Sequence, residues 1–388
     1  MHPFIATTYN SVKDITQQHW SELNCSDNVY FSPSFLSAFE SSNPNIKFNY
    51  IIISVEEKAV AIAIIQTIEL GIDAIIKNIK TSQRLKNIIR YFFCKSIIRI
   101  MFNGNVFLSG EHGLFIKDDI KKVAAIKAIA LEIKALAKQT KPLHAVLLKD
   151  FLTCSLSLTN HFSRFGFTPM YVEPNMILEL TPEWKTYDDY KSALKSKYRI
   201  KVNKADKTST TLTERIFSES DFARYKDELQ KLYENTIANA NFNAQVLNLD
   251  TYIKLREIYH EDFIVKAYFI KENLVGFLTA LANNNHLDAH FIGLNYDLNK
   301  AHAIYPRILN DYVRIGIEKQ VSHINFGRTA SEIKTTIGAV PTDLTCYILH
   351  KRPLINTIIK LLIKRVKLKE FKQHYAFKTK KEIIKTSL

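Results

Sequence analysis

Residues 265–294 read VKAYFIKENLVGFLTALANNNHLDAHFIGL, and they open with two apolar runs separated by the polar turn KEN. Apolar runs that flank a tight polar turn are typical of a β-hairpin. Polar and apolar side chains then alternate over residues 286–293, which predicts a third strand. Alternation at period two would place His286, Asp288 and His290 on one face of that strand. This polar face is the first candidate for chemistry.

The elements after this strand follow a regular order. Residues 303–319 carry apolar side chains at spacings of three and four, which is typical of an amphipathic helix. Thr329 or Ser331 would cap a short helix further along the chain. The prediction in chain order is a polar loop, an amphipathic helix, a short strand, a short helix and a last strand: residues 295–300, 303–319, 323–326, 327–334 and 342–350.

Two stretches resemble a known family. Residues 325–341, NFGRTASEIKTTIGAVP, and the order hairpin, strand, helix, strand, helix, strand resemble the GNAT-type peptidoglycan-biosynthesis proteins related to the Fem peptidyltransferases. Residues 194–204, LKSKYRIKVNK, resemble the Leu-x-x-Lys-x-Arg-x-x-Ile/Val-x-Lys/Arg opening of the second unit in those proteins, with Lys197 and Arg199 at basic positions. The resemblance implies an α/β fold of tandem GNAT-like units, with mixed central sheets flanked by helices.

A second copy of this order is recognisable in the N-terminal half. The elements predicted there are a helix, a hairpin, a second helix and a strand: residues 30–43, 50–55 with 59–70, 120–138 and 144–148. The pattern apolar-Gly-x-x-Pro occurs in each half, at Gly166 and at Gly338, which supports a duplication. A chance match between two α/β units is the alternative, because glycine and proline both end helices.

The expected domain organisation follows from these two copies. An N-terminal GNAT-like unit would span residues 1–180 and carry a basic insert at about 71–103. A C-terminal GNAT-like unit at 181–350 would carry the active site, and a basic amphipathic tail would follow at 351–388. The insert and the tail mix Lys and Arg with Ile and Leu, as helices that bind anionic membranes do. Packing of both segments on the protein itself is the alternative.

The composition points to an anionic partner. Among 388 residues, 53 Lys and Arg outnumber 38 Asp and Glu, which gives a formal net charge of +15. Nucleic acid, a phosphorylated substrate or a membrane surface would fit this charge, and a genome biased toward Lys, Asn and Ile would also explain it. The four cysteines form no CxxC pair, and the N-terminal MHPFIATTYN lacks the features of a signal peptide. We expect a cytoplasmic protein, peripheral at the inner face of the plasma membrane if its basic segments bind lipid.

Amide formation from an activated acyl donor requires a base for the amine proton and donors for the developing oxyanion. In a GNAT-like unit the polar face of the third strand would point into the cleft, so His290 and Asp288 are the candidates for the base. His286 would lie nearer the open end of the strand. The same three residues suit a metal poorly, because side chains two apart on a strand lie ~7 Å apart along one line. We therefore expect no metal.

The sequence leaves the acyl donor open. GNAT enzymes bind the pyrophosphate of acetyl-CoA with a glycine-containing loop, whereas residues 298–303, LNKAHA, contain no glycine. A helix N-terminus could still bind phosphate there, assisted by Lys300 and His302. Acyl-CoA, an acyl carrier protein and the aminoacyl-tRNA that Fem relatives use are all polyanions, and each would suit binding by Lys197 and Arg199.

Two further residues are candidates for substrate binding. Arg328 and Lys334 occupy the Gly-Arg-Thr and Glu-Ile-Lys positions of the resembled family, where they would anchor a phosphate or carboxylate. A surface pair with Glu332 is the alternative. The resulting hypothesis is an N-acyltransferase that joins the donor to an amine on a small molecule, a cell-wall precursor or a lipid. The alternative is a catalytically inactive GNAT-like protein that binds a membrane surface or RNA.

Overall fold

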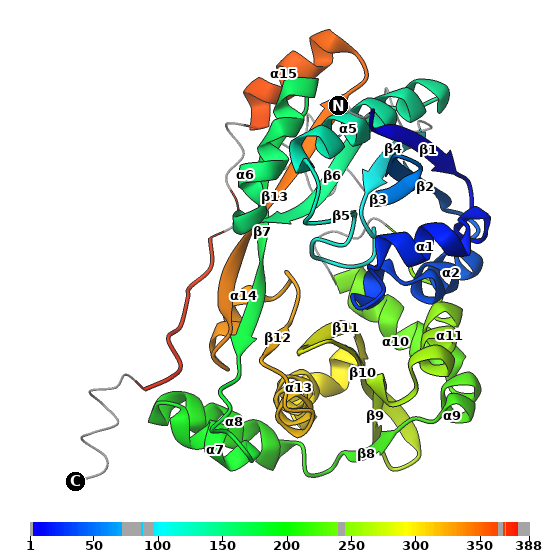
Figure 1. Ribbon diagram of the computed structural model, residues 1–388. Helices are drawn as coiled ribbons and strands as arrows, with labels where there is room; N and C mark the ends of the chain where they lie inside the picture. The colour runs from blue at the N-terminus through cyan, green and yellow to red at the C-terminus, as the bar shows by residue number, and fades with distance from the viewer. Residues whose placement is uncertain are drawn as a thin grey trace. The chain divides into compact units, whose positions relative to one another are not determined.

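The computed structural model describes residues 3–71, 87, 97–239, 245–363, 368 and 370–378. The chain forms two compact units, and Figure 1 shows strands and helices in both. Unit 1 comprises Met1–Glu173, Ala240–Thr251 and Asp343–Leu368, and unit 2 comprises Pro174–Asn239, Tyr252–Thr342 and Lys369–Leu388. Most of the predicted basic insert at 71–103 lies outside the described residues.

The sheet of unit 1 contains β1 (Ile5–Tyr9), β2 (Lys47–Val55), β3 (Lys58–Gly71), β4 (Ile97–Asn103), β6 (Ala145–Leu152) and the C-terminal part of β13 (Val340–His350). These strands pair in that order, and the short β5 (Leu114–Ile116) pairs with β3. All neighbours are antiparallel except β4 and β6, which are parallel. The predicted hairpin of this half is confirmed as β2 and β3.

The helices of unit 1 are α1 (Gln17–Leu23), α2 (Pro33–Ser42), α5 (Lys122–Gln139), α6 (Leu156–Thr159) and α15 (Pro353–Ile363). Helix α2 begins as its sequence predicts, with Pro33 in the first turn and the Ser32 hydroxyl accepting the Phe35 N–H at 3.2 Å. Helix α5 buries Ile126, Ile129 and Ile133 in the core beneath the sheet. No helix in the described part of the chain is long and apolar enough to cross a membrane.

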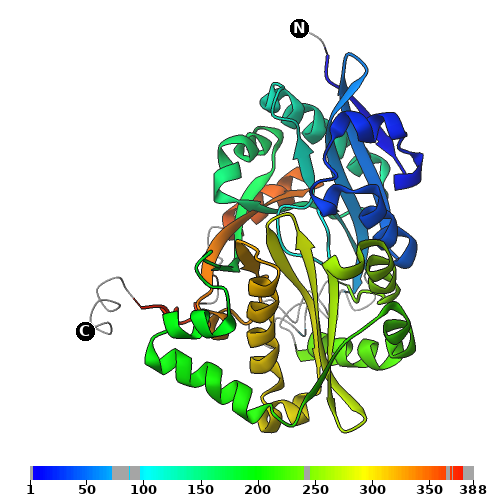
Figure 2. The same cartoon turned by 60° about the horizontal axis from the view of Figure 1, so that its bottom comes forward.

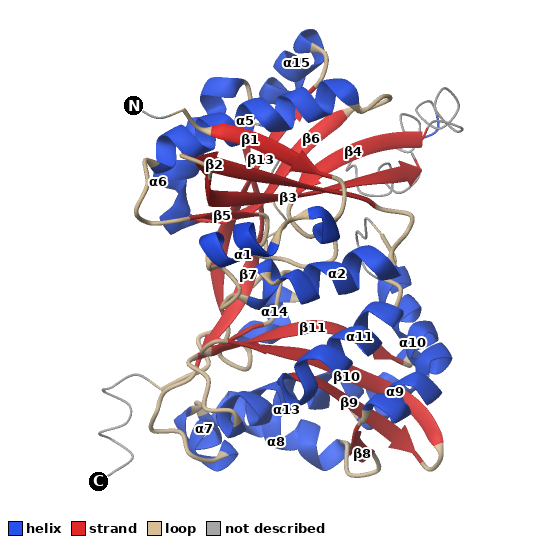
Figure 3. Ribbon diagram, turned by 45° about the vertical axis from the view of Figure 1, so that its right-hand side comes forward, coloured by secondary structure: helices blue, strands red, loops and turns tan. Residues whose placement is uncertain are grey.

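The sheet of unit 2 contains the C-terminal part of β7 (Thr168–Glu179), then β12 (His323–Asn325), β11 (His286–Leu294), β10 (Asn273–Asn283), β9 (Phe263–Ile270) and β8 (Thr213–Ile216), paired in that order. Its helices are α7 (Tyr187–Ala193), α8 (Ser196–Thr208), α9 (Glu219–Arg224), α10 (Lys226–Asn239), α11 (Asp250–Tyr259), α12 (Tyr296–His302), α13 (Ile304–Glu318) and α14 (Ser331–Thr335). Figure 2 shows α13 lying along one side of the strands, and Figure 3 shows α10 and α11 beside β11.

Both units have the same element order, and each sheet ends on a strand from the other half of the chain. In each unit an antiparallel hairpin is followed by a third strand that is parallel to the next one, namely β4 with β6 and β11 with β12. The last strand of unit 1 is β13, which pairs with β6, and the last strand of unit 2 is β7, which pairs with β12. The predicted class, a mixed α/β fold built from two units with the same element order, is confirmed.

Several predicted element boundaries are wrong. The polar loop predicted at 295–300 is mostly helix α12, because Asn295 caps it by accepting the N–H groups of Asp297 and Leu298. Neither Thr329 nor Ser331 caps α14. Ala330 precedes that helix with a left-handed φ of 55°, and the Ser331 hydroxyl donates to the Arg328 carbonyl instead.

The basic segment at residues 182–207 contains two helices, α7 and α8. The chain is extended at Leu194, which pairs with Phe377 between α7 and α8. Phe377 belongs to a C-terminal strap, residues 370–378, that is part of unit 2. The Lys195 N–H donates to the Ala376 carbonyl, and the His374 N–H donates to the Thr335 hydroxyl. Residues 370–378 of the predicted tail therefore pack on unit 2.

Gly338 provides a test of this strap. Its φ is 101°, and a Cβ there would overlap Cε2 of the Phe377 ring. Gly166 has a similar φ of 90°, but its nearest neighbour would be Leu349 Cδ1 at 3.5 Å. We expect Gly338→Ala to lower the free energy of unfolding by about 1–3 kcal/mol more than Gly166→Ala, because both strain the backbone and only Gly338→Ala displaces Phe377. Equal losses in urea unfolding would show that the strap contributes nothing.

Candidate active site

Strands β11 and β12 of unit 2 run side by side only briefly. Their parallel register ends with Asp288 opposite Asn325, whereas β11 continues to Leu294. Within the described residues, 289–294 therefore pair with β10 on one side only. Residues 289–292 are half-buried. Backbone groups at such an open edge can bind the carbonyl of an acyl donor.

A β-bulge lies at this open edge. Ala289 pairs with Ala280 and Ile292 pairs with Leu278, so His290 and Phe291 together oppose a single residue of β10, Thr279. The Thr279 hydroxyl donates to the Phe291 carbonyl at 2.8 Å, which fixes the bulge.

The bulge places two consecutive rings among the same aromatic side chains. The His290 ring lies 5.8 Å from Tyr252 on α11 and 5.9 Å from Phe263. The Phe291 ring lies 4.7 Å from Tyr233 on α10 and also stacks on Tyr252. Leu287, by contrast, is buried in the core that contains the apolar face of α13. His290 is therefore half-buried on the α10 and α11 side of the sheet, beside the open edge.

Asp288 is buried where the two strands separate. It accepts a hydrogen bond from the Asn325 amide at 3.0 Å, and its other oxygen lies 3.2 Å from His286 Nε2. The His286 ring stacks on His323 with centroids 4.9 Å apart. Burial, together with the neighbouring His286, lowers the pKa of His323. Because Asp288 is engaged on both oxygens, it is well suited to hold the strands and less well suited to accept a proton.

The loop after β12 carries Arg328 and is held from two sides. Asn325 accepts the Gly327 N–H at 3.0 Å, and Gly327 has a φ of 67°. The Lys334 ammonium is buried and donates to the carbonyl of Phe326 at 2.6 Å and of Gly327 at 3.4 Å. The structure thus places Lys334 as a support of the loop, whereas Arg328 is half-buried on the loop itself.

Lys300 and His302 lie in the last turn of α12, before α13 begins. Lys300 is exposed, and His302 Nδ1 lies 2.8 Å from the Thr211 hydroxyl. Asn299 accepts the Tyr305 N–H at 2.8 Å, and Pro306 has no N–H to offer. The first turn of α13 therefore presents few donors to a phosphate.

Lys197 and Arg199 lie on α8, which packs on α13. Lys197 is exposed and Arg199 is half-buried. Because α13 and His290 lie on opposite faces of the sheet, the structure does not bring these two basic residues together with His290.

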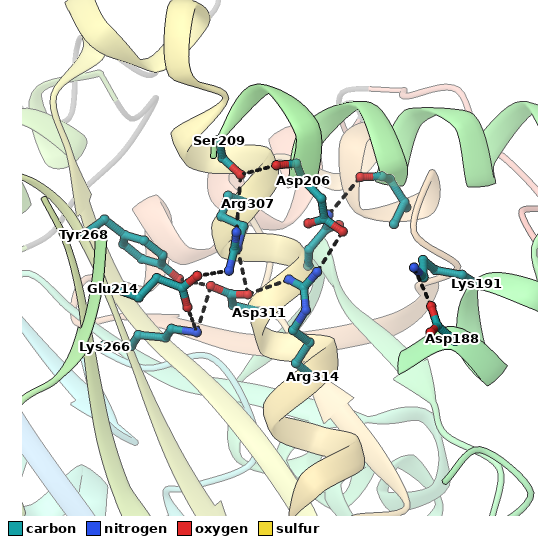
Figure 4. A network of polar contacts seen from close by, with 12 residues as sticks. Asp188, Lys191, Asp206, Ser209, Glu214, Lys266, Tyr268, Arg307, Asp311 and Arg314 are labelled. Atoms are coloured by element: carbon teal, nitrogen blue, oxygen red, sulfur yellow. Dashed lines mark hydrogen bonds and ion pairs between the residues drawn. The ribbon is translucent and has the colours of Figure 1, made fainter. Parts of the chain in front are cut away.

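A buried charge network on the α13 side was not predicted (Figure 4). Asp311 is fully buried and lies 2.9 Å from Arg307, 2.6 Å from Arg314 and 3.0 Å from Lys266. The Tyr268 hydroxyl donates to it at 2.8 Å. Burial alone would raise the pKa of Asp311, but the charges of Lys266 and Arg307 outweigh it and hold that pKa below its ordinary value.

The network connects four elements of unit 2, namely α8, β8, β9 and α13. Glu214 on β8 pairs with both Lys266 and Arg307, and Asp206 on α8 lies 2.7 Å from Arg314. Three acidic and three basic side chains are thereby balanced on the α13 face. The spacing of Arg307, Asp311 and Arg314 on one helix is the sequence signal that could have revealed it.

In unit 1 the strand pair equivalent to β11 and β12 is β4 and β6, and a loop covers its end. There β4 and β6 are paired as far as Asn103 opposite Leu148. The buried Lys149 ammonium donates to the carbonyls of Asn105 at 2.8 Å and Leu108 at 2.9 Å, so the loop after β4 is held across the end of the strand pair. Asp150 lies 3.2 Å from the same ammonium. Unit 1 therefore lacks, in its described residues, the open edge found in unit 2.

Among the residues that the structure describes, no group of three or more His, Cys, Asp or Glu side chains is placed to hold a metal ion.

Comparison with known proteins agrees with this architecture. No protein-family model and no curated protein matches the sequence. The crystal structure of FemX is similar, with a TM-score of 0.54 at 11% identity over 91% of this chain and 100% of that chain. A tandem GNAT protein from the clavulanic acid biosynthesis pathway is also similar, with a TM-score of 0.53 at 6% identity over 90% of this chain and 99% of that chain. The chain therefore has a fold similar to that of FemX and of this tandem GNAT protein, which confirms the predicted tandem GNAT-like fold.

Proposed function

We propose that unit 2 transfers an acyl group from an activated donor to an amine. The observation that carries this proposal is the open edge of β11 beside His290. Backbone N–H groups of residues 289–292 would bind the donor carbonyl there and stabilise the oxyanion that forms on it. The filled strand pair of unit 1 supports the choice of unit 2.

In the proposed reaction the amine nitrogen attacks the donor carbonyl carbon and His290 accepts the amine proton. The carbon–nitrogen bond forms, and the bond to the donor's sulfur or oxygen breaks. The leaving thiolate or alkoxide then takes up a proton. No covalent enzyme intermediate is needed, because donor and amine meet at one site. Asp288 would act as a positioning residue through Asn325 and the Gly327 turn.

The proposed donor is a polyanionic acyl carrier: acyl-CoA, an acyl carrier protein or aminoacyl-tRNA. The net charge of +15 supports such a donor. Lys197 is exposed on α8 in line with Lys201 and Lys204. Because α8 lies on the α13 side of the sheet, away from His290, these lysines would bind only donor phosphates that are remote from the acyl group. The proposed acceptor is an amine on a cell-wall precursor or a lipid, and the site of action is the cytoplasmic side of the plasma membrane.

The test is comparative profiling of lipids and small metabolites from a strain that lacks the gene and from its parent. We expect one amide to disappear and the corresponding free amine to accumulate. The amine and candidate donors are then given to the purified protein. If no amide-bearing species changes in the strain, the proposed reaction is wrong.

Arg328→Ala should raise KM about tenfold and leave kcat nearly unchanged. The expected reason is loss of a charge-assisted hydrogen bond to an anionic group of the substrate, made equally in the ground state and the transition state. Arg215→Ala removes a more exposed arginine of the same unit, paired with Asp221, and serves as the control. A drop in kcat with KM unchanged would contradict a purely binding role for Arg328.

A further inference from the structure

Helix α15 exposes apolar side chains that a folded unit normally covers. Leu354 is 82% exposed and is the most exposed large apolar side chain among the described residues, and Leu361 is 60% exposed. These two residues are seven apart, or two helical turns, and so lie on the same side of the helix. Figure 1 shows α15 at the periphery of unit 1.

The opposite side of α15 is held on unit 1. The Asn356 amide donates to the Gly166 carbonyl at 3.1 Å and accepts the His350 N–H at 2.9 Å. Ile355 and Ile359 are half-buried. The helix is therefore fixed in an orientation that leaves Leu354 and Leu361 facing solvent.

The stretch of sequence that contains this leucine pair is entirely basic in its charged residues. Residues 351–369 contain seven basic residues and no acidic residue: Lys351, Arg352, Lys360, Lys364, Arg365, Lys367 and Lys369. Of these, Lys351, Arg352 and Lys360 have exposed side chains in the structure, and each lies within three residues of Leu354 or Leu361 in the sequence. Exposed basic side chains close in sequence to exposed leucines complement a bilayer, whose headgroups are anionic and whose interior is apolar.

We propose that α15 docks unit 1 on an anionic lipid bilayer, with Leu354 and Leu361 entering the headgroup boundary and Lys351, Arg352 and Lys360 contacting lipid phosphates. A second copy of this chain is a less suitable occupant, because the basic residues of two such faces would repel each other. This inference does not depend on the acyl transfer proposed for unit 2. It identifies the element of the chain that would bring the protein to a lipid-linked amine.

The test is sedimentation of the full chain with vesicles. The wild type should bind vesicles of phosphatidylglycerol and phosphatidylcholine, should not bind pure phosphatidylcholine, and should be released by salt. Leu354→Ser with Leu361→Ser should weaken binding about tenfold or more. Lys360→Glu should weaken it at least about fivefold, because it replaces an attraction by a repulsion.

The matched control is Ile5→Ser with Leu131→Ser, which alters two other exposed apolar residues of unit 1 and should leave binding unchanged. Equal loss in both double variants, equal binding to the uncharged vesicles, or no binding by the wild type would overturn the proposal. A wild-type dimer that the α15 variant converts to a monomer, without vesicle binding, would assign this face to self-association. Turnover of a soluble amine should be the same in all variants, so failure of this proposal is distinguishable from failure of the proposed reaction.

Discussion

His290→Ala should lower kcat by about 10²- to 10⁴-fold, the usual cost of removing a general base. The expectation rests on the position of His290 at the bulge of β11, beside the edge that β12 leaves open. The measurement is steady-state turnover of the amine identified by metabolite profiling. The free energy of unfolding should change little, because the ring is only half-buried.

A second histidine of the same strand provides the control. His286 lies at the start of β11, where the strands are still paired, and its ring stacks on His323. His286→Ala should cost much less turnover than His290→Ala. Added imidazole should partly restore the rate of His290→Ala and leave that of His286→Ala unchanged. If His290→Ala retains wild-type turnover, the base is a different group.

Asp288→Asn distinguishes the two candidates for the base. An asparagine there still offers an oxygen to the Asn325 amide, so the strand junction should persist. If Asp288 only positions the loop, turnover should fall modestly and the pH dependence of kcat should stay the same. A loss as large as that of His290→Ala, with a changed pH profile, would transfer the role of base to Asp288.

The sequence predicts the elements whose signals are local and periodic. The hairpin β9 and β10 and helix α13 follow directly from alternation and from three- and four-residue spacing. Helix α12 was missed because its cap, Asn295, lies in a stretch too polar to show an apolar face. The exchange of β7 and β13 between the sheets has no local signal, since it depends on pairing between residues far apart in the sequence.

The candidate site was predicted only in part, for a similar reason. Alternation identifies the polar face of β11, but the bulge that adds Phe291 to the surroundings of His290 depends on pairing with β10. The sequence alone suggests that Lys334 is exposed on a short helix. Only the structure shows that its ammonium donates hydrogen bonds to the Phe326 and Gly327 carbonyls. A helix of five residues is too short for its sequence pattern to show that one of its lysines is buried.

Asp311→Ala should lower the free energy of unfolding by about 3–5 kcal/mol, the range for breaking a buried ion pair by removing one partner. Without this carboxylate, Lys266, Arg307 and Arg314 would share only Glu214 and Asp206, and one positive charge would be uncompensated. Urea unfolding of the full chain, followed by a probe in unit 2, measures the loss. Asp188→Ala is the control, because Asp188 is 82% exposed in its pair with Lys191 and should contribute at most about 1 kcal/mol.

The pH dependence of the free energy of unfolding tests the same prediction independently. The pKa of Asp311 is lowered in the folded state, so its contribution is fully present above the ordinary pKa of an aspartate and is lost as pH falls through the folded value. The stability difference between wild type and Asp311→Ala should therefore be largest near neutral pH and shrink in acid. A difference that is constant with pH would mean that the loss comes from the cavity rather than from the charge. The network would then hold α8 and α13 together by packing, and its balance of three acids and three bases would have no electrostatic consequence.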